Sequence, residues 1–323
     1  MLQYLTVLRE CDRAIGAGDP ARPAGLADVR TRCDDGGMPE SPEVQALVEF
    51  LDERVVGRAI AEVDIAEFRI VKTRARPPAS LVGARIIGTR RFGKHVGFET
   101  TSGWLIIGFG RNGWIRWQGA GEPPPGQPVP EVARIALDDG VVLRIVDTGE
   151  FLAVTAAVVD APSDVAAIAA LGPDPLSADF SRDDLERALG ARRKQIKALL
   201  QEQASLAGIG NAYSDEILHR ARLPHVVHAA VLDGEARGRL FDATIDVLRG
   251  ALSDRRGLPP DRLKPAKTQA MTVHGRGGQP CPLCGTAIVD DVFGGASAQH
   301  CPHCQRERPA GDALWGGAEG ESR

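Results

Sequence analysis

The chain has 323 residues, enough for two or three domains, and its 39 basic and 43 acidic side chains give a formal net charge of −4. This balance argues against binding nucleic acid through net charge, but it leaves room for a local basic patch. No apolar run reaches the roughly 18 residues of a membrane span, and no secretory signal is recognisable. We therefore expect a cytoplasmic protein without a membrane partner.

The first 37 residues are rich in Gly, Ala, Asp and Arg and show little hydrophobic period. We expect residues 1–37 to be disordered, or to be an upstream stretch joined wrongly to the true start. The competing interpretation is a small N-terminal element, because Leu2, Leu5 and Leu8 have the spacing of a short helix.

The chemistry of Met38-Pro39-Glu40 depends on where translation starts. If Met38 is the start and is removed, the chain begins with a secondary amine beside a carboxylate, and such an amine is a nucleophile for sugar aldehydes. Inside a longer chain, the Pro39 nitrogen is a tertiary amide without a lone pair to donate. The same residues are therefore catalytic in one chain and inert in the other.

A helix is predicted directly after this segment, with Ser41 as its N-cap, Pro42 at its first position and Gly57 after its end. Its apolar residues recur at helical spacing and form one face. These residues are Val44, Leu47, Val48, Leu51 and Val55.

From residue 62 to about 155, the pattern changes to short β-like segments bounded by Gly, Asp or Ser. Examples are residues 84–87, 95–98, 104–107 and 141–146. Many short strands with frequent turns predict a β-sandwich or a barrel. We assign this domain, together with the preceding helix, to residues 38–165.

The chain becomes helical after a break between domains at residues 171–176, and we assign residues 171–262 to a helical domain. Helices are expected around 181–190, 193–203, 213–222 and 233–252. Residues 257–265 are expected to form a second linker. A cysteine-rich module at 270–310 and a disordered tail at 311–323 complete the predicted organisation.

Four of the six cysteines form two Cys-x-x-Cys pairs separated by 16 residues. They are Cys281, Cys284, Cys301 and Cys304. Two such pairs can place four thiolates tetrahedrally around Zn²⁺, so we predict one structural zinc ion. The alternatives are two reduced pairs without metal and, less favoured, a redox role. Four sulfurs fill the coordination sphere, so this zinc is not expected to catalyse a reaction.

A glycine-rich turn at residues 207–213 lies between two predicted helices. The turn permits close approach of an outside group, and the backbone amides at Gly210 and beyond would attract an anion such as a DNA phosphate. Asn211 offers a further side-chain donor. Two clusters of basic residues, containing Lys94 and Lys197, are candidate phosphate contacts. An ordinary helix–turn–helix corner and solvated basic faces are the alternatives.

Several parts of the sequence together resemble the formamidopyrimidine-DNA glycosylase/endonuclease VIII family. Residues 38–44 are similar to its N-terminus, residues 203–216 to its helix–two-turn–helix and residues 274–305 to its zinc finger. Residues 90–94 match the segment with its phosphate-contacting lysine, and residues 171–176 match its interdomain stretch. The order of these motifs makes the resemblance specific, although no single motif is specific alone.

The resemblance covers roughly residues 38–306 and implies an α+β fold. This fold has an N-terminal β-sandwich with a leading helix, a helix–two-turn–helix domain and a C-terminal zinc-finger β-hairpin. The resemblance further implies a bacterial, nucleoid-associated monomer that binds damaged double-stranded DNA in the cleft between its domains. Such an enzyme excises oxidised bases and then cleaves the abasic site by β-elimination through a Schiff base.

The resemblance also implies roles for particular residues. Pro39 would attack C1′ of the damaged nucleotide, and Glu40 would act as a general acid on the sugar. Lys94 would hold a phosphate. Asn211 and the hairpin amides, including that of Gly210, would hold the flanking phosphates.

Further DNA contacts are expected from Lys197, Arg276 and Arg111, but the sequence departs from the family at several positions. Arg111 stands where purine-excising members have a methionine that fills the gap left by a flipped base. Glu150 replaces an arginine that precedes a phenylalanine, and Ala296 replaces the phosphate-binding arginine of the zinc hairpin. The residues that recognise damage are therefore altered, whereas the nucleophile and the hairpin are retained.

These departures leave alternatives to the favoured bifunctional glycosylase and lyase. One is an abasic-site lyase that has lost base excision. Another is a non-catalytic zinc protein that binds damaged DNA, and a weaker one is a zinc module for protein contacts without a DNA role.

Overall fold

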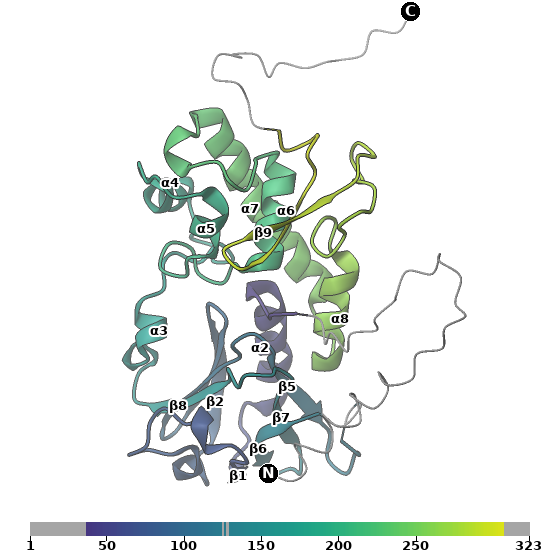
Figure 1. The fold of residues 1–323 in the computed structure, drawn as a ribbon. Helices are drawn as coiled ribbons and strands as arrows, with labels where there is room; N and C mark the ends of the chain where they lie inside the picture. Colours follow the sequence, from purple (N-terminus) through teal and green to yellow (C-terminus); the bar gives the residue numbers. More distant parts are fainter. Residues whose placement is uncertain (1–36, 125, 127–128, 307–323) are drawn as a thin grey trace, which may run out of the picture.

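The computed structural model describes residues 37–124, 126 and 129–306. Figure 1 shows a β-rich lobe below and a helical lobe above, with helix α2 (Ser41–Val55) between them. The predictions for residues 1–36 and for the tail after residue 306 lie outside the described residues.

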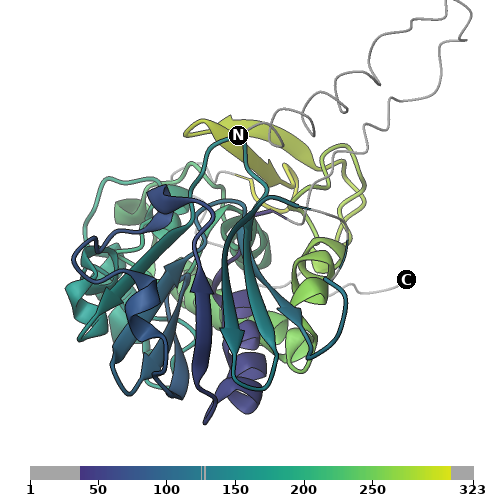
Figure 2. The same cartoon turned by 90° about the horizontal axis from the view of Figure 1, so that it is seen from below.

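The lower lobe is the predicted β-sandwich, seen from below in Figure 2. Two antiparallel sheets of four strands have the orders β1-β6-β7-β5 and β2-β3-β4-β8. The strands are β1 (Ile60–Asp64), β2 (Ile86–Phe92), β3 (His95–Thr100), β4 (Gly103–Gly108), β5 (Gly113–Gln118), β6 (Glu131–Leu137), β7 (Val142–Asp147) and β8 (Thr155–Val159). The short 3-10 helices of this lobe are η1 (Phe68–Ile70), η2 (Pro78–Leu81) and η3 (Pro162–Asp164).

Strand β4 shows why the sandwich segments are so apolar. Leu105 pairs with Phe98 of β3, and both side chains enter the core between the sheets. Ile106 points to the other face, where Ile168 of helix α3 (Ala166–Ala169) covers it. Because successive side chains alternate between two covered faces, this strand is a continuous apolar run.

Helix α2 confirms the predicted helix, but its N-cap is Glu40 rather than Ser41. Glu40 has an extended backbone, and its N–H donates to the Glu43 side chain three residues later (3.3 Å). This bond is half of a capping box. The sequence suggested the Ser41 hydroxyl as the capping group, whereas in the structure the Glu43 carboxylate accepts the hydrogen bond at the start of the helix. Ser41 is instead fully buried in the first turn, against Gly208.

The upper lobe contains the expected helices, which surround a second hydrophobic core. They are α4 (Arg182–Leu189), α5 (Ile196–Gln201), α6 (Asn211–Ala221) and α7 (Gly234–Arg255), with the 3-10 helix η4 (Ala229–Val231). The zinc hairpin consists of β9 (Val289–Phe293) and β10 (Ala296–His300) and packs against α6. The helix–two-turn–helix domain and the hairpin agree with the predicted fold class.

The second linker expected before the cysteine module is wrong, because most of it belongs to helix α8 (Pro260–Ala270). Pro259 is its N-cap and Pro260 its first residue, where proline is well tolerated, whereas Pro265 lies inside the helix. Two tertiary contacts fix α8 on the sandwich: Leu263 is buried in the sandwich core, and Trp114 Nε1 donates to the Pro260 carbonyl (2.9 Å). Tertiary packing therefore overrides the weak local signal.

Within the described ranges, none of the helices combines the length and apolar character needed to cross a bilayer.

Removing a core side chain of α2 should destabilise both lobes, because this helix packs on the sandwich and on α7. We expect Leu47→Ala to lower the free energy of unfolding by about 2–5 kcal/mol, as for other buried leucines. Glu53→Ala is the matched control on the exposed face and should change it by about 0.5 kcal/mol or less. Urea denaturation measures both, and equal effects would contradict the central position of α2.

Candidate active site

A buried polar cluster lies where five elements meet: the start of α2, the β2–β3 turn, the start of α6, the end of α7, and α8. Glu40, Glu43, Lys267 and Arg255 form its centre, and all are at least 97% buried. Pro39 is buried beside them. The residues come from both lobes, so the cluster exists only when the lobes are packed together.

The Glu40 carboxylate is held by the N-terminus of α6. Its Oε2 accepts a hydrogen bond from the Gly210 N–H, and its Oε1 accepts from the Ala212 N–H (3.0 Å) and from Lys267 Nζ (3.0 Å). The hairpin amides do bind an anion at a helix N-terminus, as predicted, but this anion is Glu40. The expectation that the Gly210 amide holds a DNA phosphate is therefore corrected.

These contacts decide the charge of Glu40. Burial raises the pKa of its carboxyl, but the Lys267 and Lys94 ammoniums and the Gly210 N–H outweigh burial, so the pKa lies below its usual range. Glu40 is consequently ionised at neutral pH. A residue that starts as a general acid needs a raised pKa, so the structure favours Glu40 as a proton acceptor first.

Glu43 connects α2 to the helical lobe. Its Oε1 accepts from the Tyr213 hydroxyl (2.6 Å) and faces Arg255 Nε (2.8 Å), while Lys267 Nζ lies 3.8 Å from its Oε2. Burial raises the pKa of the Glu43 carboxyl despite these cations. The two carboxylates of the first turn of α2 thus have pKa values shifted in opposite directions.

Lys94 enters the cluster from the β2–β3 turn, where Gly93 adopts a positive φ of 55°. Its Nζ lies 3.7 Å from Met38 Sδ, and a Cβ added to Gly210 would lie only 2.8 Å from that Nζ. Burial lowers the pKa of the Lys94 ammonium, and the Lys267 charge adds to this effect while Glu40 opposes it. The structure thus brings Lys94, Glu40 and Pro39 together.

The sequence prediction missed Lys267, which lies just after the predicted linker at residues 257–265. Lys267 Nζ donates to the Met38 carbonyl (2.8 Å) and to Glu40, and it lies over the Tyr213 ring at 5.1 Å from the centroid. One signal was available: the chain has 6 lysines against 33 arginines. In a chain that uses arginine so widely, each lysine marks a position where the compact ammonium has been kept.

Asn211 is the first residue of α6, two residues before the predicted helix start, and its amide already has protein partners. Its Nδ2 donates to the Ser297 carbonyl of the zinc hairpin (2.9 Å), and its Oδ1 accepts from Gln201 Nε2 (3.0 Å). In this structure Asn211 therefore joins α6 to the zinc hairpin.

Two predicted DNA contacts have protein partners in the structure. Lys197 is fully buried and donates to Asp215 Oδ1 (2.5 Å), so its ammonium cannot reach a phosphate. The Arg276 guanidinium donates to the carbonyls of Met271 (3.2 Å) and Gln269 (3.2 Å), which lie at the C-terminal end of α8. Arg276 caps this helix and thereby supports the position of the cluster.

The departures from the family pattern lie on exposed loops. Arg111 is exposed in the β4–β5 turn, and Phe151, which follows Glu150 after β7, is 80% exposed. A hydrogen bond from Thr148 Oγ1 to the Asn112 carbonyl (3.5 Å) connects the two loops. Ala296, at the start of β10, is also exposed.

The four paired cysteines form a site that fits zinc. Cys281 Sγ lies 3.9 Å from Cys304 Sγ, Cys284 Sγ lies 3.4 Å from Cys301 Sγ, and all four sulfurs lie within 4.8 Å of one another. Tetrahedral Zn–S bonds of about 2.3 Å require S–S distances of about 3.8 Å. His219 Nε2 of α6 lies 3.3 Å from Cys281 Sγ and attaches the site to the helical lobe. The cluster and the zinc-finger match reported below support one structural zinc ion.

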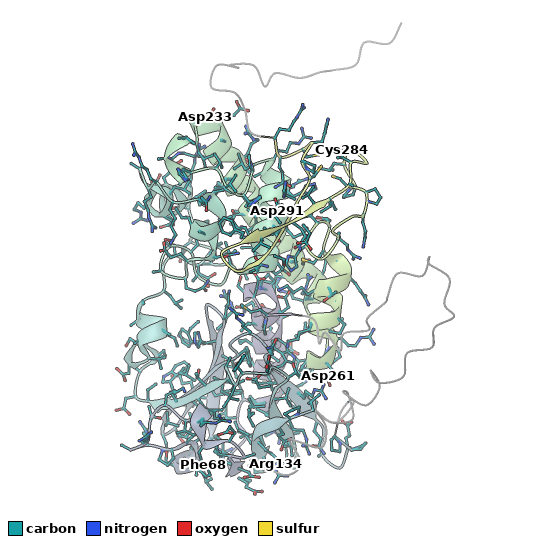
Figure 3. The ribbon with its side chains drawn as sticks, viewed as in Figure 1. Phe68, Arg134, Asp233, Asp261, Cys284 and Asp291 are labelled. Carbon is teal, nitrogen blue, oxygen red and sulfur yellow. The ribbon has the colours of Figure 1, made fainter. Side chains whose placement is uncertain are left out.

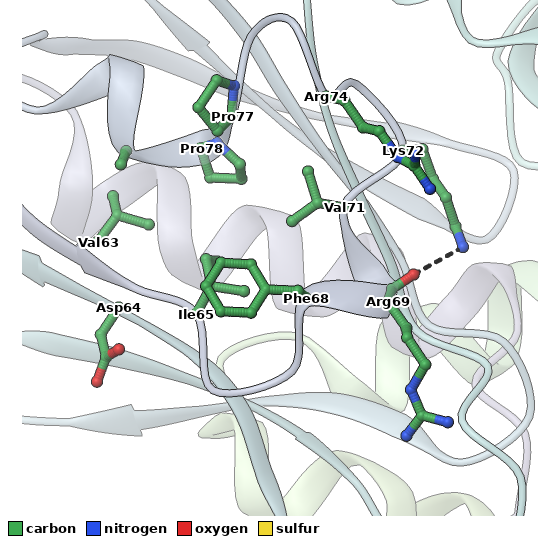
Figure 4. A pocket seen from close by; sticks show the side chains of 11 residues that line it. Val63, Asp64, Ile65, Phe68, Arg69, Val71, Lys72, Arg74, Pro77 and Pro78 are labelled. Carbon is green, nitrogen blue, oxygen red and sulfur yellow. Dashed lines mark hydrogen bonds between the residues drawn. The ribbon is translucent and has the colours of Figure 1, made fainter.

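A hollow of about 1020 Å³ lies in the lower lobe, and none of the residues that line it belongs to the polar cluster. Figure 4 shows its apolar wall, with Phe68 beside Val71, and its basic edge, where Lys72 Nζ donates to the Arg69 carbonyl (3.0 Å). Figure 3 places Phe68 and Cys284 at opposite ends of the molecule. The polar cluster, with its perturbed titratable groups, is therefore the better candidate for chemistry.

Comparison with known proteins assigns each part of the chain. The N-terminal domain model of formamidopyrimidine-DNA glycosylase matches residues 38–154, and the helix–two-turn–helix domain model of the same enzyme matches residues 171–259. The zinc finger found in formamidopyrimidine-DNA glycosylase and isoleucyl-tRNA synthetase matches residues 278–306.

The formamidopyrimidine-DNA glycosylase of Salinispora arenicola is 36% identical to the chain over 290 residues, which cover 83% of this chain and 96% of that protein. The chain belongs to the formamidopyrimidine-DNA glycosylase family. The Heliobacterium modesticaldum member of this family is 34% identical and is covered completely. The family match begins at residue 38, at the Met-Pro-Glu sequence.

Solved structures of the family share the fold. A Lactococcus lactis formamidopyrimidine-DNA glycosylase bound to DNA with an abasic site has a TM-score of 0.72 at 26% identity, covering 83% of this chain and all of that one. The wild-type Lactococcus lactis enzyme in complex with DNA that contains an oxidised pyrimidine has a TM-score of 0.74, at the same identity and coverage.

The close approach of Glu40 and Lys94 to Gly210 gives a stability test. A Cβ at this position would lie 2.6 Å from Glu40 Cδ, so we expect Gly210→Ala to lower the free energy of unfolding by about 1–3 kcal/mol. Gly250→Ala is the control, because a Cβ at this α7 position meets nothing within 4 Å and should stabilise by up to about 1 kcal/mol. If the Gly210→Ala and Gly250→Ala chains were equally stable in thermal denaturation, the close packing around Gly210 would be contradicted.

The zinc site predicts one zinc ion per chain by elemental analysis. Cys301→Ser removes a buried ligand, so we expect the zinc to be lost and amide exchange in the hairpin to increase greatly. Cys33→Ser, in a cysteine outside both pairs, is the control and should retain the metal. Full zinc content in the Cys301→Ser chain would contradict the four-sulfur site.

Proposed function

We propose that this protein is a base-excision repair enzyme that removes damaged bases from double-stranded DNA and cleaves the resulting abasic site. The observation that carries the proposal is the position of Pro39, buried beside the ionised Glu40 and two lysines at the junction of the lobes. The family membership and the damaged DNA bound in solved structures of the family support the same function. Such an enzyme would work on the bacterial nucleoid.

The proposed nucleophile is the Pro39 amine of a chain that begins at this residue. An α-amino group with a pKa of about 8 is roughly 10% neutral at pH 7, whereas a lysine with a pKa of about 10.4 is roughly 0.04% neutral. The terminal amine therefore contains several hundred times more of the reactive form. The start of the family match at residue 38 supports a chain in which Met38 is the initiator and is removed.

The reaction divides into displacement and elimination. The Pro39 lone pair forms a bond to C1′ as the bond between C1′ and the base breaks; the base leaves with the bonding electrons and takes a proton from water, and the amine gives up its own proton. Glu40, ionised in this structure, accepts that proton and can return it to the sugar ring oxygen as the ring opens. The resulting iminium acidifies the C2′ proton, whose removal expels the 3′ phosphate by β-elimination.

DNA contacts are proposed for exposed groups around the cluster. Lys94, half-buried at the β2–β3 turn, would hold a phosphate next to the reacting sugar. Phe151 is an exposed apolar side chain that could enter the base stack, and Arg111 lies on the neighbouring loop. Asn211 would contact the backbone only after exchanging the Ser297 carbonyl for a phosphate.

An abasic-site lyase without base excision is the second candidate. The observation that favours it is the exposed loop pair with Arg111 and Glu150 in place of the residues expected to recognise a damaged base. A carboxylate facing DNA repels the phosphate backbone, whereas the lyase chemistry needs only an abasic site. Excision assays on DNA with an oxidised base separate the two candidates.

Borohydride trapping tests the proposed chemistry directly. A chain that begins at Pro39 should form a covalent adduct with abasic DNA, because borohydride reduces the iminium to a stable amine. The 323-residue chain is the matched control and should form none, because its Pro39 nitrogen is an amide. Gel electrophoresis of labelled DNA measures the adduct.

Each failure of this experiment has a separate meaning. If the short chain forms no adduct, the enzymatic proposal fails. Salt-sensitive DNA binding without strand nicking would then indicate a non-catalytic DNA-binding protein. An adduct from the 323-residue chain would show that another amine is the nucleophile.

A further inference from the structure

Lys267 contacts the peptide bond that precedes Pro39. It is only 3% exposed, and its Nζ donates to the Met38 carbonyl oxygen (2.8 Å) and to Glu40 Oε1 (3.0 Å). The Met38 carbonyl carbon is bonded to the Pro39 nitrogen, so Lys267 Nζ lies within about 5 Å of that nitrogen. The bonding partners of Lys267 are therefore the two groups that flank the proposed nucleophile.

Removal of Met38 changes the surroundings of this ammonium. The chain that begins at Pro39 lacks the carbonyl that accepts from Lys267, so one N–H of the ammonium loses its partner and faces the new amine. The other contact, with Glu40, remains. A cation and a free amine are then held about 5 Å apart in a site from which most water is excluded.

The charges around the Pro39 nitrogen add to an excess of positive charge. The facing groups come from α2, the β2–β3 turn, α6, α7 and α8. They are Glu40, Glu43, Lys94, Tyr213, Arg255 and Lys267. With both carboxylates ionised there are three cations and two anions, and a protonated Glu43 would increase the excess. Protonation of the amine would add a further positive charge.

We propose that Lys267 is a positioning residue that keeps the Pro39 amine unprotonated and orients Glu40 to accept its proton. This inference rests on the proposed function and deepens it, by assigning a role to a helix that the family motifs in the sequence did not indicate. The ammonium needs no contact with DNA, because it acts through the amine and the carboxylate on either side of it. A purely structural ion pair with Glu40 is the alternative.

The pH profile of the lyase step separates these roles. We would measure single-turnover cleavage of DNA with a preformed abasic site between pH 5.5 and 9.5, using chains that begin at Pro39. Lys267→Met removes the charge and nearly preserves the shape, and Lys267→Gln is a second neutral variant that can still donate to Glu40. Lys264→Met is the matched control, because Lys264 is a buried lysine of the same helix that donates to Asn112.

Without the Lys267 ammonium nearby, protonation of the Pro39 amine becomes easier and the pKa of this amine should rise. The acidic limb of the pH profile should therefore shift to higher pH, by about one to two units, in both neutral Lys267 variants. Cleavage at pH 6 should then fall about tenfold to a hundredfold, while cleavage at pH 9 changes little. Lys267→Arg, which retains the charge, should keep the limb close to its original position. The Lys264 control should leave the limb unchanged.

Three outcomes would overturn the inference. An unshifted limb in folded Lys267→Met and Lys267→Gln chains would mean that the amine does not sense this charge. An equal fall in rate at every pH would assign Lys267 a structural role only. A similar shift with Lys264→Met would show that any nearby lysine has this effect. If the unmodified short chain cleaves no abasic DNA at any pH, the proposed function fails instead.

Discussion

The arrangement of the whole molecule depends on one buried carboxylate. Glu40 caps the helix that follows it and at the same time accepts hydrogen bonds from the N-terminus of α6 and from Lys267. An ionised carboxylate without these partners would be costly to bury, so the two lobes must pack closely for the site to exist. Gly208 and Gly210 permit this approach, because a side chain at either position would collide with the start of α2.

The neighbouring residues extend this constraint into a buried charged network. Glu43 binds Tyr213 and Arg255, so α2 is also attached to α7. Two lysines that the sequence offers for phosphate binding have different positions: Lys94 borders the cluster, whereas Lys197 is buried with Asp215. Among the described residues, four lysine or arginine side chains are buried: Lys197, Arg255, Lys264 and Lys267.

The sequence predicted the features that depend on local pattern. Apolar periodicity gave α2 and the strands, and the spacing of Cys281 and its partners gave the metal site. It failed where distant contacts decide the outcome. Helix α8 is held by Trp114 and by the sandwich core, which no local pattern reveals, and Lys267 was missed with it. The partner of the α6 amides was also beyond prediction, because a phosphate and the Glu40 carboxylate satisfy the same helix N-terminus equally well.

The division of the site between the two lobes limits how the chain can be cut or recombined without loss of the site. Pro39 lies next to the sandwich in the sequence. The backbone amides that bind Glu40 belong to the helical lobe, and Lys267 lies on α8. Neither half carries a reactive centre by itself. A chain severed in the stretch at residues 171–176 would have to reassociate before any chemistry returned, and grafting one lobe onto a foreign partner would transfer only part of the machinery.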